Sequence, residues 1–166
     1  MPASQTHQDM IDMVRRALRR RGYTKDRMFD ESDGLIQVFK EVDPPAGELS
    51  RHRLAAADMV VLDEKDDPLL IVEVETGASP KTFGRSIPPY MLARDVLIPR
   101  RGHKLVGSLK LLIVVPDQPA DGSKRAQLDD LERDWNSSPI VGGSQLRKLA
   151  LTEMGRLDQA LDRLEM

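Results

Sequence analysis

Apolar residues recur at helical spacing in three parts of the chain. Near the N-terminus the spacing predicts a helix that ends before Gly22 and carries arginines on its polar face. A second helix is expected over residues 79–97, with an interruption near Pro88-Pro89. A third is expected over 124–135. Its apolar side consists of Ala126, Leu128, Leu131 and Trp135.

Runs of β-branched and other apolar residues predict strands between these helices. They lie at 34–42, 54–63, 67–76 and 108–116. The short, turn-rich connection between the second and third runs favours an antiparallel hairpin. The fourth run is dense in branched apolar residues, which is typical of a strand buried on both faces. The C-terminal segment fits either a helix or a strand, and we favour a strand over 147–153 followed by a helix from about Gly155.

This order of elements predicts an α/β fold. A hairpin-linked meander followed by a helical crossover into a buried strand implies a mixed central sheet flanked by helices. The length of 166 residues and the hydrophobic content of 40% suit one domain with a real core. No repeat or linker divides the chain, so we expect residues 1–166 to form a single domain.

Composition excludes several classes of function. The chain has no cysteine, which excludes disulfides, thiolate metal sites and cysteine nucleophiles. No apolar run approaches the ~20 residues that span a bilayer, and the N-terminal stretch has no signal-peptide pattern. We therefore expect no membrane association and a cytoplasmic, reducing compartment. Neither a Gly-x-Ser-x-Gly element nor a glycine-rich phosphate-binding loop occurs.

Charge is strongly segregated along the chain, although the net charge is only −2. Residues 31–80 carry twelve acidic and four basic side chains, whereas residues 81–110 carry one acidic and seven basic. This distribution suggests a site that gathers a cation beside a surface that attracts an anion. For any single block, the alternative is that the charges simply face solvent.

Three carboxylates interrupt apolar strand segments: Asp58 in the second strand, and Glu73 and Glu75 in the third. A spacing of two puts Glu73 and Glu75 on one face, and a hairpin centred on residues 64–67 brings Asp58 opposite Glu73. Such buried charges are costly unless a cation compensates them, and hard oxygen ligands suit Mg²⁺ or Mn²⁺. The alternative is that Glu75 ends an exposed strand face and Asp58 hydrogen-bonds a backbone or arginine group.

The stretch AADMVVLDEKDDPLLIVEVETG resembles the PD-(D/E)xK nuclease superfamily, and the element order over about residues 8–116 agrees with its core. Asp58 corresponds to the motif aspartate, and Glu73-Val74-Glu75 falls where the superfamily has acid-x-lysine. The resemblance implies a restriction-endonuclease-like three-layer core. It also implies magnesium-dependent (or manganese-dependent) hydrolysis of phosphodiester bonds in DNA, less often in RNA.

The sequence departs from the superfamily pattern at Glu75, which replaces the usual lysine. Some restriction endonucleases of this superfamily also carry Glu-x-Glu, so the resemblance still implies an active site. Asp58 and Glu73 would bind the metal, and Glu75 would be a third ligand or orient the water. Lys81 would replace the lysine; the alternative is an exposed lysine in the first turn of a helix. A further acid from the first helix, Asp9 or Asp12, is a family feature that exposure explains equally well.

The resemblance also implies contacts to nucleic acid. Substrate phosphates would be held by Arg85, Arg94, Arg100, Arg101 and Lys104. The arginine-rich first helix would be a second contact surface, and His103 a phosphate contact or a surface residue. Cleavage of both DNA strands would favour a homodimer. The alternative function is a catalytically degenerate nuclease-fold protein that binds nucleic acid or a partner protein, for which Glu75 is the main argument.

Overall fold

The computed structural model describes residues 6–119, 122–138 and 144–166. Residues 1–5, part of the stretch in which no leader was expected, lie outside the described residues. The helices are α1 (His7–Arg20), α2 (Leu49–His52), α3 (Pro80–Ser86), α4 (Pro88–Met91), α5 (Lys124–Asn136) and α7 (Leu157–Arg163), with short 3₁₀ turns at Lys25–Arg27, Ala46–Glu48 and Met154–Arg156. The strands are β1 (Met28–Asp30), β2 (Ile36–Phe39), β3 (Arg53–Ala57), β4 (Met59–Leu62), β5 (Pro68–Val74), β6 (Asp95–Ile98), β7 (Gly102–Leu105), β8 (Leu109–Val115) and β9 (Leu146–Glu153).

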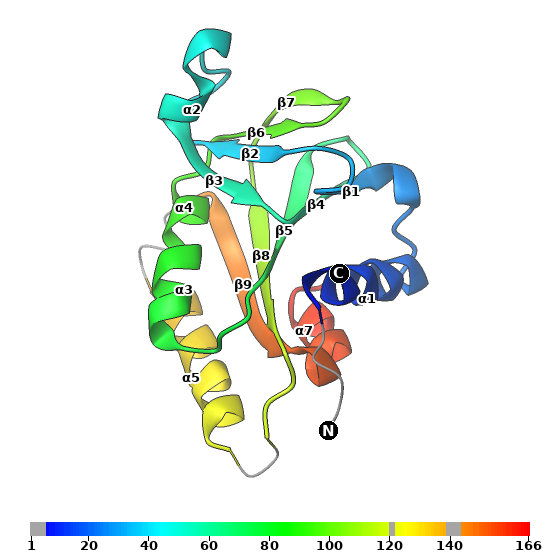
Figure 1. The fold of residues 1–166 in the computed structure, drawn as a ribbon, viewed down its shortest axis with the longest axis vertical. Helices are drawn as coiled ribbons and strands as arrows, with labels where there is room; N and C mark the ends of the chain where they lie inside the picture. Colours follow the sequence, from blue (N-terminus) through cyan, green and yellow to red (C-terminus); the bar gives the residue numbers. More distant parts are fainter. Residues whose placement is uncertain (1–5, 120–121, 139–143) are drawn as a thin grey trace.

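A mixed sheet with the strand order β1-β4-β5-β8-β9 forms the centre of the molecule (Figure 1). The hairpin predicted between the second and third apolar runs is confirmed, since β4 pairs antiparallel with β5. After a crossover through α3 and α4, β8 pairs parallel with β5, and β9 pairs parallel with β8. The mixed character of the sheet is therefore confirmed: it is antiparallel at one end and parallel at the other. Its first strand, however, is β1, and the predicted strand 34–42 forms β2 of a second sheet instead.

Helices cover both faces of this sheet, so the fold is α/β (Figure 1). On one face, α1 and α7 pack against one set of strand side chains, including Val72 and Leu112. On the other face, Phe83 of α3 and Leu128 of α5 pack against the alternating set, including Ile113. β8 is buried on both sides, which explains its nearly uninterrupted apolar sequence.

The predicted strand 54–63 is in fact two strands in two sheets. β3 ends at Ala57 and β4 begins at Met59, so the chain leaves one sheet and enters the other at Asp58. β3 belongs to a second, antiparallel sheet with the order β3-β2-β6-β7. The carboxylate of Asp58 therefore lies between two strands that pair in different sheets. The apolar sequence on both sides of Asp58 did not indicate this change of sheet.

The prediction of a helix to Leu97 is wrong beyond Met91. A hairpin of β6 and β7 follows α4 instead. Asp95, Val96 and Ile98 of β6 are almost fully buried, and Leu97 is more exposed. Gly102, the first residue of β7, has a positive φ of 77°, a conformation that glycine adopts without strain.

The C-terminal prediction is confirmed: β9 covers the predicted strand, and α7 follows it. The helix predicted over 124–135 is also present as α5, but Ala126 is exposed and only Leu128 is fully buried in it. None of the helices in the described part of the chain is long and apolar enough to cross a membrane.

Candidate functional site

Asp58 and Glu73 face each other at the end of the β4–β5 ladder. Met59 pairs with Val72 in the antiparallel register, so the next position along places Asp58 opposite Glu73, as the hairpin register predicted. One oxygen of Asp58, Oδ2, accepts a hydrogen bond from the backbone N–H of Val74 at 2.7 Å. The break in the strand at Asp58 therefore fixes the carboxylate over the end of β5.

Glu73 is the most perturbed acid of this group. Burial is the largest cause of its raised pKa, followed by the negative charge of Asp58, a hydrogen bond with that side chain and the charge of Glu75. Together they raise the pKa of Glu73 to about 10. Glu73 accordingly holds its proton at neutral pH, unless a cation replaces the proton between the two carboxylates.

Glu75 directly follows the last residue of β5, and its side chain contacts α3. The Ser86 hydroxyl donates a hydrogen bond of 2.5 Å to Oε1 of Glu75. The buried side chains of Phe83 and Ile87 anchor this segment to the core, so Ser86 is held against the end of the strand. An open pocket of about 370 Å³ results here. It is lined by Glu75, Thr76, Gly77, Thr82, Arg85 and Ser86.

His7, the first residue of α1, also belongs to this region, and sequence reasoning assigned it no role. Its Nε2 lies 3.2 Å from Oδ1 of Asp58, and its Nδ1 lies 3.2 Å from Oε1 of Glu31. Thr6 and Asp9 form a capping box that starts α1 at this point. No spacing in the sequence connects His7 with Asp58, because the contact depends on how α1 packs against the sheet.

The two acids of the first helix do not join this group. Asp9 accepts hydrogen bonds from Thr6 in the capping box, and Asp12 pairs with Gln8 at 2.9 Å. Hydrogen bonds from Thr6 are the largest cause of the lowered pKa of Asp9. Both acids therefore serve the helix itself.

The predicted cations fall into two groups. Lys81 is exposed, Arg85 lines the pocket beside Glu75, and Arg94 lies between α4 and β6. None of these three pairs with a carboxylate within residues 6–119, 122–138 and 144–166. Lys81 does not line the Glu75 pocket, so its assignment as the replacement lysine rests on its position at the start of α3.

The other predicted phosphate contacts are already neutralised by acids. Arg100 pairs with Asp33 at 2.7 Å, and Asp66 binds both Arg101 at 3.1 Å and Lys104 at 2.8 Å. Arg101 also covers the ring of Phe29, 5.5 Å from its centroid. Arg101 and Lys104 thus tie the β6–β7 hairpin to the β4–β5 turn, and Arg100 ties it to the segment between β1 and β2.

His103 is likewise engaged within the fold. Its Nδ1 bonds the carboxylate of Asp95, a residue that is almost fully buried, and its Nε2 lies 3.4 Å from Asp43. The ring also packs at a tilt against Phe39. This histidine compensates a buried acid inside the hairpin.

The described residues contain no group of three or more His, Asp or Glu side chains arranged to hold a metal ion. Magnesium, however, keeps several waters and is commonly held by one or two carboxylates together with substrate phosphates. Asp58 and Glu73 offer two oxygen ligands of that kind, and burial without a cation leaves Glu73 protonated. The donor set therefore fits Mg²⁺ or Mn²⁺ through these two side chains.

Comparison with known proteins adds no relative to this picture. No family model, no curated protein and no solved structure matches the chain.

Proposed function

We propose that the protein is a metal-dependent nuclease whose site is formed by Asp58, Glu73 and Glu75. The observation that carries this proposal is the placement of Asp58 opposite Glu73 where the strand breaks, with Glu75 directly after the end of β5. Burial, the negative charge of Asp58 and a hydrogen bond with that side chain raise the pKa of Glu73 to about 10. A divalent cation would relieve that repulsion.

Each side chain has a role that its contacts support. Asp58 and Glu73 would hold the metal, which when bound lowers the pKa of a water and polarises a phosphoryl oxygen. Val74 keeps Asp58 oriented through its backbone N–H. Glu75, oriented by Ser86, would accept a proton from the attacking water, a role that requires its carboxylate to be ionised.

Nucleic acid is the substrate that the charge distribution supports best. Arg85 opens into the same pocket as Glu75, and Lys81 lies on the same helix, α3. Neither has an acidic partner in the described ranges. Unpaired cations beside an acidic site attract a polyanion to it. Following the sequence resemblance, DNA is the form of nucleic acid that we propose.

The second candidate is a nuclease-fold protein that binds nucleic acid without cleaving it. It is favoured by the engagement of Asp58, whose two oxygens already contact the N–H of Val74 and the ring of His7. A metal at this carboxylate would compete with His7 for Oδ1 of Asp58. The two candidates differ in whether bound DNA is hydrolysed.

The substrate assignment is tested with Arg85→Gln and Arg100→Gln, two exposed arginines of which only the second is paired. Arg85→Gln is expected to weaken DNA binding and lower its salt dependence by about one released counterion. Arg100→Gln removes a cation that Asp33 already neutralises, so its binding should be close to wild type. Fluorescence anisotropy over a salt series and initial cleavage rates would measure both. If the two variants bound and cleaved DNA equally well, the proposal that DNA contacts Arg85 would be contradicted.

A further inference from the structure

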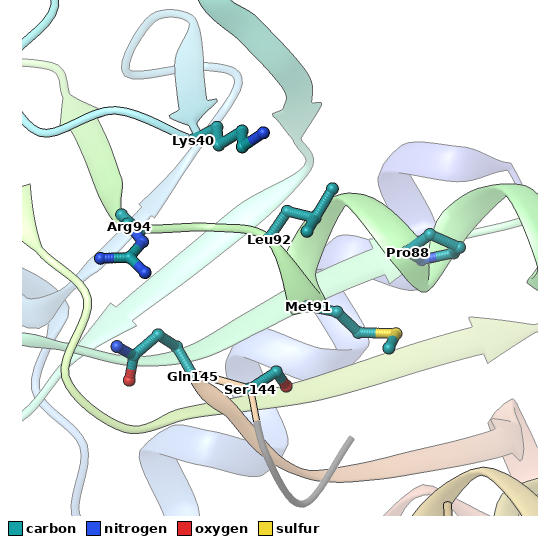
Figure 2. Close-up of a pocket in the computed structure, with 7 residues that line it drawn as sticks. All are labelled: Lys40, Pro88, Met91, Leu92, Arg94, Ser144 and Gln145. Atoms are coloured by element: carbon teal, nitrogen blue, oxygen red, sulfur yellow. The ribbon is translucent and has the colours of Figure 1, made fainter. Parts of the chain in front are cut away.

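A second pocket, of about 440 Å³, lies between α4, the end of β2 and the start of β9 (Figure 2). Among the residues that the structure describes, it shares none with the pocket beside Glu75. Its lining residues are Lys40, Pro88, Met91, Leu92, Arg94, Ser144 and Gln145. α4 is fixed here by Ile87 and Tyr90, both fully buried, so the wall that it contributes belongs to the rigid core.

Two cations border this pocket without a carboxylate partner. Lys40 directly follows β2 and Arg94 directly precedes β6, which places both at one end of the second sheet. Both are exposed, and neither forms an ion pair with any residue that the structure describes. In contrast, Arg100 and Lys104 of the neighbouring β6–β7 hairpin pair with Asp33 and Asp66. An anionic ligand is therefore the charge complement of the pocket.

The remaining wall suits an apolar, flat group. Met91 and Leu92 project from the end of α4 beside Pro88, and Leu92 is 51% exposed although it is a large apolar residue (Figure 2). The thioether of methionine makes favourable contacts with aromatic rings. Across the pocket, the amide of Gln145 carries both a donor and an acceptor, which a polar ring edge can match.

We propose that this pocket binds a nucleotide unit. The phosphate lies between Lys40 and Arg94, the base packs on Met91 and Leu92, and Gln145 hydrogen-bonds the edge of the base. The volume lies within the range of pockets that hold small ligands and cofactors. The unit is either a free nucleotide or one residue of a single-stranded nucleic acid. The inference does not depend on catalysis at the acidic site, because the two pockets are separate.

The test is a titration of the full-length protein carrying ¹³C-labelled methionine methyl groups. Adenosine monophosphate, adenosine, inorganic phosphate and a short oligoadenylate are added separately. We expect the Met91 signal, assigned with Met91→Leu, to shift with the nucleotide or the oligonucleotide. The buried Met10 and Met59 should keep their positions. Tighter binding of the oligonucleotide identifies a strand as the source, and equal or weaker binding identifies a free nucleotide.

The cations are tested with the double variant Lys40→Gln, Arg94→Gln, which should weaken nucleotide binding at least about tenfold. Lys65→Gln, which replaces an exposed lysine in the β4–β5 turn, is the matched control and should bind as wild type does. Unchanged Met10 and Met59 signals would show that each variant is folded. The proposal is overturned if neither the nucleotide nor the oligonucleotide shifts Met91, or if the double variant binds as tightly as the control.

Discussion

Replacing Glu73 with glutamine is expected to remove a loss of stability that the metal-free protein shows as the pH rises. The pKa of Glu73 is about 10 in the folded state, above its ordinary value of 4.5, so the native state keeps a proton that the unfolded chain releases. This contribution to stability is complete below the unfolded pKa and is lost as the pH approaches the folded pKa. The slope reaches about 1.4 kcal/mol per pH unit in between.

Urea denaturation with a chelator present, at several values between about pH 5 and pH 9, would measure this effect. The free energy of unfolding should fall with pH in the wild type and stay flatter in Glu73→Gln. Glu64→Gln, at an exposed position in the β4–β5 turn, is the control and should follow the wild type. Magnesium should stabilise the wild type more at high pH, because binding displaces the proton. If the free energy of unfolding changed with pH in the same way in the wild type and in Glu73→Gln, the raised pKa of Glu73 would be contradicted.

Replacing Arg15 with methionine is expected to lower the free energy of unfolding by about 3 kcal/mol at neutral pH. Arg15 of α1 bonds the carboxylate of Asp30, whose side chain is only 3% exposed on β1. Burial alone would raise the pKa of Asp30, but hydrogen bonds from Ser32 and Arg15 hold it below its ordinary value. Without Arg15 a buried acid loses its charged partner, and the attachment of α1 to the sheet weakens.

Arg16→Met provides the matched comparison, because Arg16 is the exposed neighbour on the same helix and should change stability by less than about 0.5 kcal/mol. Asp30 contributes its stability above the unfolded pKa near 3.8, and this is lost as the pH falls through the lower folded pKa. The difference between Arg15→Met and wild type should therefore shrink in acid. Equal destabilisation by the two variants in urea denaturation would contradict the role of Arg15.

The fold was predictable where one local pattern dominated. The amphipathic spacing around Val14 gave α1, and the branched apolar run at 108–116 gave the doubly buried β8. The β6–β7 hairpin was missed because its strands are four residues long and follow two prolines that suggested a helix. The break at Asp58 was missed because the change of sheet depends on pairing partners distant in the sequence.

The part of the candidate site that depends on strand pairing in the β4–β5 hairpin was predictable from the sequence. Opposition of Asp58 and Glu73 follows from the hairpin turn and the period of two, and the observed pairing has that register. The contact of His7 with Asp58 needed the packing of α1. Sequence alone also could not distinguish Arg85 from Arg101, since the partner of Arg101 is Asp66, on a turn 35 residues away.

Magnesium- or manganese-dependent cleavage of DNA tests the proposed function most directly. The purified protein would be incubated with linear duplex, single-stranded and branched DNA, beside Asp58→Ala, Glu73→Ala and the control Glu64→Ala. We expect metal-dependent cleavage of at least one substrate, at least about a hundredfold slower in the Asp58 and Glu73 variants and unchanged in the control. Cleavage that survives both site variants would contradict the account. So would the absence of any cleavage together with no calorimetric binding of either metal.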